Sequence, residues 1–293
     1  MSGEKGFRKI FWVAVFLLPS LTGLILFTLI PILTSLGLTT FEWDLLTAPQ
    51  FVGVANFERL LKDGNFWRAL RNTLYFIVTY IPLVMVFAMG VALVLNQKIK
   101  GIIFFRAAFF IPVVSAWVAV ALMWRWIFNP QFGIFNYLLS LVGITGPAWL
   151  FDPQWAMPAI VIASVWKDIG FVMIMLLAGL QGIPEVYYEA ASIDGSSKWQ
   201  QFRNITLPLL SPTIFFALII SLINSFQVFD QVWIMTEGGP AGATTVLVEQ
   251  IVKNAFSYSR MGYASAISWV LFLLVFGATA IQTWMQNRWV HYE

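Results

Sequence analysis

Long apolar runs alternate with shorter polar stretches along most of the chain. A helix needs roughly 20 apolar residues to cross the hydrocarbon core of a bilayer. Six segments meet this requirement, at about residues 10–36, 72–95, 105–128, 156–180, 209–235 and 262–285. The pattern therefore predicts an all-α integral membrane protein with six transmembrane helices.

The first apolar run follows Lys5, Arg8 and Lys9, as the apolar region of a secretory signal peptide would. A signal peptide has an apolar region of roughly 7–15 residues, and this run is longer and lacks an obvious small-residue cleavage site. We therefore interpret it as a retained membrane helix. Its two prolines, Pro19 and Pro31, are expected to kink it.

A polar stretch, residues 184–208, separates the fourth and fifth apolar runs. Pro184 favours the start of a helix, and Glu185 and Glu189 lie near its positive N-terminal end. Gly195 can adopt the left-handed conformation that ends a helix. These features predict a short helix that ends near Gly195.

A second short helix is expected directly after this glycine. Ser197 and Gln200 have the spacing of a capping box, in which each side chain accepts a hydrogen bond from the backbone of the other residue. The helix is expected to run from Lys198 to Ile205 and to be limited by Pro208.

Composition agrees with a membrane protein and excludes several kinds of site. The chain is 59% hydrophobic and 11% charged, whereas soluble domains carry about 25% charged residues. It has no Cys, which excludes disulfides and thiolate chemistry. Its single His, His291, makes a histidine-based triad or metal cluster implausible, and a net charge of +3 does not indicate nucleic-acid binding.

The sequence offers no catalytic signature. A glycine-rich phosphate loop followed by Lys and Ser or Thr is missing, so the chain itself is not expected to hydrolyse ATP. A His-Glu zinc signature is missing too. We therefore expect a chain without catalytic residues, metal or cofactor.

Two ionisable residues, Lys167 and Asp168, lie near the middle of the fourth apolar run. An ionisable side chain at the bilayer centre costs about 2.5–3.5 kcal/mol on insertion scales and is a functional candidate. The two residues either line a polar pathway or form a mutually screened pair that faces the bundle. Neighbouring helical positions differ by roughly 100°, so the pair need not be in contact.

The fifth run carries three amides, Asn224, Gln227 and Gln231, at spacing i, i+3 and i+7, which places them on one face of a helix. Ser221 and Asp230 lie near that face. Amides both donate and accept hydrogen bonds, as sugar hydroxyl groups require. The alternative is hydrogen bonding between helices that holds the bundle together, at ~0.6–2 kcal/mol per contact.

One spaced pattern resembles a known family. The pattern consists of Glu189-Ala190-Ala191, three residues, Gly195, nine residues, Ile205, one residue and Leu207-Pro208. It resembles the EAA loop of permease subunits of binding-protein-dependent ABC importers. Further segments resemble the carbohydrate-uptake branch, which includes glycerol-phosphate permeases, and within it the first, MalF-like or UgpA-like, partner of a permease pair. These segments are Leu18-Pro19-Ser20, Pro31-Ile32-Leu33, Phe51–Phe57, Gly238-Gly239-Pro240 and Gly262–Ala266.

The resemblance implies a type I ABC importer permease fold in one membrane domain, residues 1–293, with both termini and the loop 181–208 in the cytoplasm. The distribution of Lys and Arg favours the same orientation. Nine of these residues lie on the side of the membrane that holds the N-terminus, and six or seven lie on the opposite side. The nine are Lys5, Arg8, Lys9, Lys98, Lys100, Arg106, Lys198, Arg203 and Arg288.

The resemblance also implies partners: a second homologous permease, two ATP-binding subunits and an extracytoplasmic solute-binding protein. Helix 184–194 would couple to an ATPase, where small alanine side chains allow close approach. The residues implied in docking are Glu189, Ala190, Ala191, Asp194 and Gly195.

Amides on the helix after the EAA loop contact the sugar in maltose-type permeases, and the resemblance places Asn224 and Gln227 at corresponding positions, with a one-residue gap in the alignment. The expected function is uptake of a sugar or related polyol at the cell membrane. Two alternatives stay open. One is an ABC permease for an amino acid or peptide. The other is an ion-coupled secondary transporter, which would use acidic residues within the membrane and would show internal repeats. Asp168 and Asp230 are weak evidence for such ion coupling, and the sequence shows no clear internal repeat.

Overall fold

The computed structural model describes residues 2–97, 100–286 and 290, with side chains from residue 11 onward. Lys98, Arg288 and His291, which entered the sequence analysis, lie outside the described residues. The chain divides into two compact units, residues 1–63 with 251–270 and residues 64–250 with 271–293. Each unit is described by itself.

Five helical segments within the described residues are long and apolar enough to cross a membrane, or six if a bent pair of helices is counted as one span. The five are Phe11–Leu38, Gly64–Leu95, Ala156–Gln181, Lys198–Phe226 and Met261–Gln286. The bent pair replaces the straight third span that the hydropathy pattern predicts.

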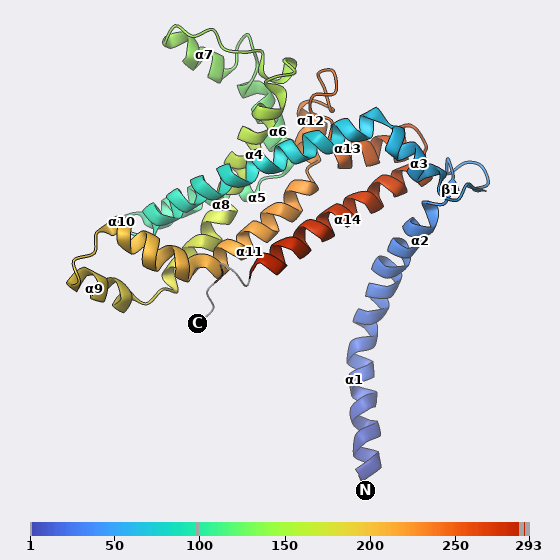
Figure 1. The fold of residues 1–293 in the computed structure, drawn as a ribbon, viewed down its shortest axis with the longest axis horizontal. Helices are drawn as coiled ribbons and strands as arrows, with labels where there is room; N and C mark the ends of the chain where they lie inside the picture. Colours follow the sequence, from blue (N-terminus) through green and yellow to red (C-terminus); the bar gives the residue numbers. More distant parts are fainter. Residues whose placement is uncertain (1, 98–99, 287–289, 291–293) are drawn as a thin grey trace. The chain divides into compact units, whose positions relative to one another are not determined.

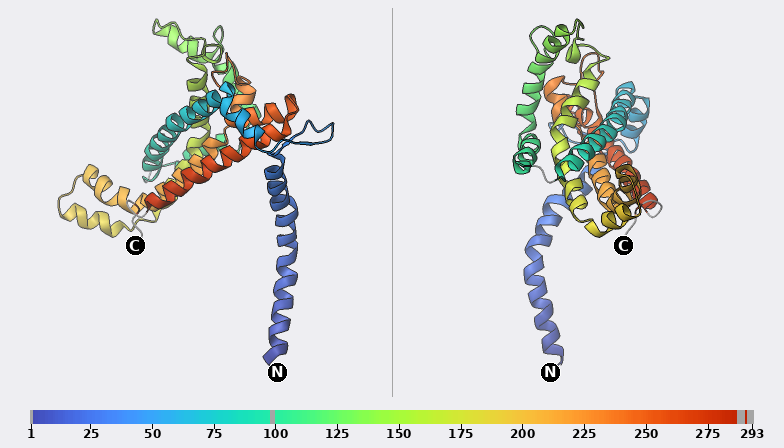
Figure 2. Two further views of the ribbon diagram at one scale, coloured as in Figure 1. Left: turned by 45° about the vertical axis from the view of Figure 1, so that its right-hand side comes forward. Right: turned by 90° about the vertical axis from the view of Figure 1, so that its left-hand side faces the viewer.

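In the first unit, α1 (Ser2–Leu24), the π-helical turn η1 (Ile25–Leu29) and α2 (Ile30–Leu38) form one continuous helix. Both views of Figure 2 show it in blue as a single rod. None of its most apolar window is buried. The helical ladder is distorted at η1, just before Pro31, whereas Pro19 lies inside uninterrupted α1.

A small ordered loop follows this helix. Strands β1 (Phe41–Glu42) and β2 (Gln50–Phe51) pair antiparallel, and the short helix α3 (Ala55–Lys62) comes next. The start of α14 (Met261–Gln286) packs closely on β1, because a Cβ atom at Gly262 would overlap the carbonyl oxygen of Phe41. Only glycine permits this approach.

The core of the second unit is the packing of α4 (Gly64–Leu95) on α8 (Ala156–Gln181). Residues at i+4 spacing on α4 lie on one face, and all are buried: Phe76, Tyr80, Val84, Ala88 and Ala92. The small side chains at the end of this row allow the two helices to approach closely.

The third apolar run forms α5 (Ile102–Val114) and α6 (Trp117–Ile127), bent by 100°. The prediction of one uninterrupted helix over 105–128 is therefore wrong. Pro112 supplies no backbone N–H to the last turn of α5, and the next two residues after Val114 have extended ψ angles of 138°. The chain turns at those two residues, Ser115 and Ala116.

Beyond α6, the chain forms the short helix α7 (Ile134–Leu141) and then the 3₁₀ turn η2 (Trp149–Phe151). The remaining helical elements of the described residues are α9 (Glu185–Ile193), α10 (Lys198–Gln201), η3 (Phe202–Thr206), α11 (Leu207–Phe226), α12 (Asp230–Met235), α13 (Leu247–Val252) and η4 (Lys253–Ser257). Figure 1 labels most of these elements and shows α9 and α10 together beside one end of α11.

The polar stretch 184–208 contains the two expected short helices, α9 and α10. Gly195 between them has φ +78°, in the left-handed region, and both hydrogen bonds of the capping box of Ser197 and Gln200 are present. The expected stop at Pro208 is wrong, because the helix continues through η3 into α11. The proline is tolerated there because it lies in the first turn after a π-helical segment, where the regular backbone ladder is already interrupted.

Candidate functional site

A cavity of about 590 Å³ lies in the second unit, beside the middle of α4 and α8. Aromatic rings of Phe76, Trp117 and Phe229 form part of its wall. Its polar lining contains amides, carboxylates and hydroxyls, namely Tyr80, Asp168, Asn224, Ser225, Gln227, Asp230 and Gln231. The cavity therefore combines flat apolar surface with hydrogen-bonding groups, as the binding site of a polyhydroxylated solute requires.

The amides reach this cavity through a break in the fifth apolar run. Helix α11 ends at Phe226, and the chain is non-helical until α12 begins at Asp230. The predicted single helical face for Asn224, Gln227 and Gln231 is therefore wrong. The structure still brings all three side chains to one cavity, with Asn224 on α11, Gln227 in the non-helical segment and Gln231 on α12.

The three amides differ in what they contact. Gln231 is buried, and its Nε2 donates to Ser164 Oγ on α8 at 3.3 Å, so it holds α12 to α8. Asn224 and Gln227 are exposed, and their side-chain amides make no hydrogen bond within the described part of the chain. Asn224 and Gln227 thus have free hydrogen-bonding capacity toward the cavity.

Asp168 lines the cavity from α8 and is held by a residue that the sequence analysis did not identify. Tyr80 Oη donates to Asp168 Oδ2 at 2.7 Å. The Tyr80 ring stacks on Phe76, with ring centroids 5.1 Å apart. The signal in the sequence is a tyrosine in the middle of an apolar run, away from the ends where interfacial aromatics are expected.

Lys167 is next to Asp168 in the sequence but is not among the residues that line the cavity. Its Nζ donates to the carbonyl oxygen of Val113 at 3.0 Å and lies 5.1 Å from the centroid of the Trp117 ring. Because α5 ends at Val114, the Val113 carbonyl is one of the last four that lack an intrahelical partner. Lys167 therefore stabilises the bend between α5 and α6.

The backbone of α8 also lies directly against α5. A Cβ atom at Gly170 would overlap the carbonyl oxygen of Phe109. Glycine at this position allows the two helices to pack, which brings Val113 within reach of Lys167.

The residues predicted to dock on an ATPase lie on or just after α9, on the surface of the chain. Glu189, Ala190, Asp194 and Gly195 are exposed, and Ala191 is half-buried. Large apolar side chains are exposed next to them, with Val186 at 60%, Ile193 at 87% and Trp199 at 68%. An exposed surface that is both apolar and acidic is typical of a protein contact.

Hydrogen bonds that the sequence did not reveal join α9 to the next helical segments. Tyr188 Oη and Thr206 Oγ1 are 2.9 Å apart, and Gln201 Nε2 donates to Ser192 Oγ at 2.8 Å. These contacts connect α9 to the start of the continuous helix that includes α11, so the helical pair is joined to a membrane helix.

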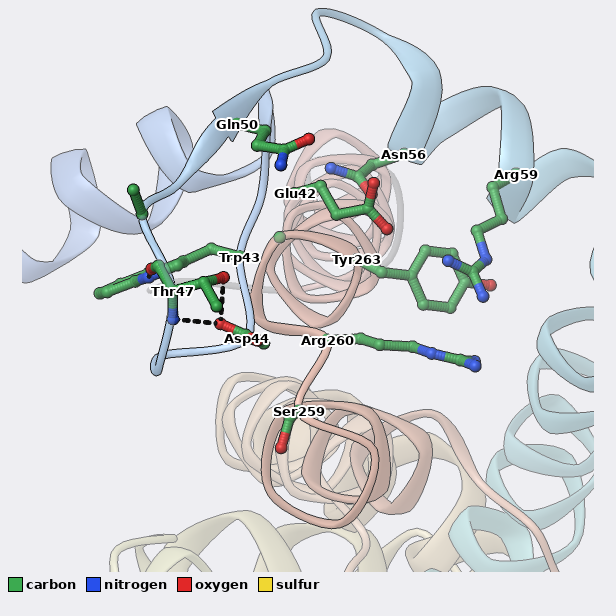
Figure 3. A pocket seen from close by; sticks show the side chains of 12 residues that line it. Glu42, Trp43, Asp44, Thr47, Gln50, Asn56, Arg59, Ser259, Arg260 and Tyr263 are labelled. Atoms are coloured by element: carbon green, nitrogen blue, oxygen red, sulfur yellow. Dashed lines mark hydrogen bonds between the residues drawn. The ribbon is translucent and has the colours of Figure 1, made fainter.

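A second, smaller pocket of about 290 Å³ lies within the first unit (Figure 3). Asp44 Oδ1 accepts hydrogen bonds from the backbone N–H groups of Leu46 and Thr47, and also from the Thr47 hydroxyl. These hydrogen bonds lower the pKa of the Asp44 carboxyl. The bond from the Thr47 N–H has the largest effect and the bond from the Leu46 N–H the next largest. These bonds order the loop between β1 and β2.

The other polar side chains of this pocket also hold their own unit together. Asn56 Nδ2 donates to two carbonyl oxygens, those of Thr39 and Phe41, at 2.9 Å each. The Arg59 guanidinium lies 5.0 Å from the ring centroid of Tyr263. Because these groups are already engaged, the cavity beside α4 and α8 is the better candidate for solute binding.

Comparison with known proteins identifies a family that the chain matches and several similar proteins. Residues 64–291 match the family described as binding-protein-dependent transport system inner membrane component. The trehalose/maltose transport system permease protein MalF of Thermococcus litoralis is 38% identical over 267 residues, with 90% of each chain covered. The lactose transport system permease protein LacF of Rhizobium radiobacter is 38% identical over 267 residues, with 89% of each covered.

A further relative is the probable ABC transporter permease protein YesP of Bacillus subtilis, 39% identical over 283 residues, which cover 95% of this chain and 91% of YesP. Among solved structures, a chain of a bacterial ABC transporter involved in import of the acidic polysaccharide alginate has a TM-score of 0.85 and 24% identity. The match covers 98% of this chain and 99% of that one. It shows that the two chains have the same fold.

Proposed function

Because the chain belongs to the binding-protein-dependent transport system inner membrane components, we propose that it is the permease subunit of an ABC importer for a sugar or related polyol. Members of this family are membrane transport subunits that are not themselves catalytic. Similarity to permeases named for trehalose/maltose and lactose transport supports a saccharide as the solute.

The observation that carries this proposal is the cavity beside α4 and α8 with its free amides. Asn224 and Gln227 supply donors and acceptors together, which matches the hydroxyl groups of a saccharide. The rings of Trp117 and Phe229 supply flat apolar surface for the faces of a sugar ring. Asp168 adds a carboxylate acceptor to the same wall.

One such chain would form half of a pathway, and a second homologous permease would form the other half. An extracytoplasmic solute-binding protein would deliver the solute, and two ATP-binding subunits would drive the cycle from the cytoplasm, where both termini would lie. Membership of the family supports this assembly, and the lack of a phosphate-binding loop in the sequence supports ATP hydrolysis by a separate subunit.

Helix α9 would be the coupling element. The exposed Glu189, Ala190, Asp194 and Gly195, with half-buried Ala191, would contact an ATPase together with the neighbouring apolar side chains. Because Tyr188 and Ser192 are hydrogen-bonded to Thr206 and Gln201, movement of α9 would be transmitted to α11. Helix α11 leads to the amides of the cavity, so docking and solute access would be mechanically connected.

The test is purification of the tagged chain from its native membrane, followed by reconstitution of the recovered complex into liposomes. We expect a second permease and an ATPase in about 1:1:2 proportion, and uptake of a radiolabelled sugar that requires ATP and the binding protein. Recovery of the chain alone, with uptake driven by an ion gradient, would overturn the proposal and favour a secondary transporter.

A further inference from the structure

We propose that this half of the pathway selects uncharged saccharides over anionic ones such as uronates, through the carboxylates of Asp168 and Asp230. The inference rests on the proposed function, because it concerns which saccharides the same cavity accepts. It follows from where the structure places positive and negative charges around the cavity.

The two carboxylates are part of the cavity wall. Asp168 enters from the middle of α8, and Asp230 is an exposed residue at the start of α12. Among the described residues that line the cavity, none is a Lys, Arg or His. A solute in this cavity therefore meets acidic and neutral groups from this chain.

The nearest basic residue in the sequence is kept out of the cavity. Lys167 is buried at 6% exposure, and its ammonium donates to the Val113 carbonyl oxygen. The Trp117 ring, which does line the cavity, lies 5.1 Å from that ammonium. The Lys167 charge is thus engaged by a carbonyl dipole and an aromatic ring and is unavailable for direct contact with a solute carboxylate.

Tyr80 fixes the orientation of one of the two carboxylates and is a positioning residue in this proposal. Its phenol donates a hydrogen bond of 2.7 Å to Asp168 Oδ2, and Asp168 Oδ1 makes no hydrogen bond within the described part of the chain. Oδ1 can accept a charge-assisted hydrogen bond from a sugar hydroxyl, which an uncharged saccharide supplies. A solute carboxylate at that place would meet like charge in a setting with less solvent than bulk water.

Fold similarity does not decide this property. A chain with the same fold belongs to an importer of the acidic polysaccharide alginate. Charge preference therefore depends on the side chains of the cavity wall, and the charges described above are features of this chain.

The experiment uses the complete complex in detergent without its binding protein, so that the permeases alone discriminate. Equilibrium binding is measured for a neutral galacto-oligosaccharide and for an oligogalacturonate of the same length, both radiolabelled. We expect the wild-type complex to bind the neutral probe more tightly by on the order of tenfold. In the double variant Asp168→Asn/Asp230→Asn, which keeps side-chain size, the ratio should fall toward one.

The matched control is Glu58→Gln, which removes an exposed carboxylate from α3, outside the residues that line the cavity. Its binding ratio should equal that of the wild type. Equal affinity of the wild type for both probes, or an unchanged ratio in the double variant, would overturn the inference alone. Binding of neither probe would overturn the proposed function together with it. A wild-type ratio near one overturns the inference even if the variant fails to assemble.

Discussion

Tyr80 donates a hydrogen bond of 2.7 Å to Asp168 Oδ2 and so joins the middle of α4 to the middle of α8. The two residues are 88 positions apart in the chain. In a membrane, a carboxylate needs a partner of this kind, because bulk water is not available to solvate it. The bond fixes a carboxylate at the wall of the cavity that we assign to the solute.

Tyr80→Phe removes this bond and keeps the ring that stacks on Phe76. We expect the KM for solute uptake to rise several-fold with little change in the maximal rate, because Asp168 loses its orientation while the conformational cycle is intact. The loss in stability should be small, about 0.5–1.5 kcal/mol for one hydrogen bond. Transport assays at varied solute concentration measure this, and an unchanged KM would contradict the positioning role.

Asn224→Ala and Gln227→Ala should each weaken solute binding about tenfold, because each removes a free amide from the cavity wall. Gln231→Ala is the matched comparison, since this amide already bonds Ser164 on α8. That variant should chiefly lower thermal stability. Binding and melting measurements on all three variants separate the two effects, and the same behaviour in all three would contradict the assignment.

Gly170→Ala should destabilise the protein by about 1–3 kcal/mol, because the new methyl group would overlap the carbonyl oxygen of Phe109 and force α5 away from α8. Gly90→Ala is the control, since nothing lies within 4 Å of a Cβ atom there. Thermal unfolding in detergent measures the difference. Equal melting temperatures for the two variants would show that α5 does not pack on α8 in this way.

Gly195→Trp should uncouple transport from ATP hydrolysis, because an indole at the exposed end of α9 obstructs docking and strains a backbone with φ +78°. Solute binding by the complex should stay unchanged. Gly101→Trp is matched to it, with the same φ of +78° and open space around its Cβ position. Unchanged uptake in Gly195→Trp, or an equal loss in Gly101→Trp, would contradict the coupling role of α9.

Lys167→Met should weaken the contact between α8 and the end of α5, because the Val113 carbonyl loses its donor while the volume of the side chain is kept. Lys167→Arg keeps a donor and is expected to retain part of the stability. Proteolysis of the segment around the bend, compared among the three proteins, measures this. Equal cleavage rates would show that the bend does not depend on Lys167.

The sequence by itself determined the features that depend on neighbouring residues. Apolar runs of sufficient length predicted the membrane helices, since transfer into the bilayer depends on the residues of one segment. The capping box of Ser197 and Gln200 and the left-handed Gly195 were predicted correctly, because caps and turns involve residues within a few positions of one another. The coupling, pathway and orientation roles remain predictions.

Only the tertiary structure decided where the chain departs from regular helix and which distant groups meet. The bend after Val114 is compatible with the hydropathy pattern, because that pattern does not report the direction of the chain. Beside the bend, Lys167 donates to the carbonyl oxygen of Val113, 54 positions away. The break after Phe226 likewise put Asn224 and Gln227 on one cavity wall with Asp168. The helical period predicts which residues share a face of one helix within a few turns. Which residues of other helices they contact depends on side-chain packing throughout the unit.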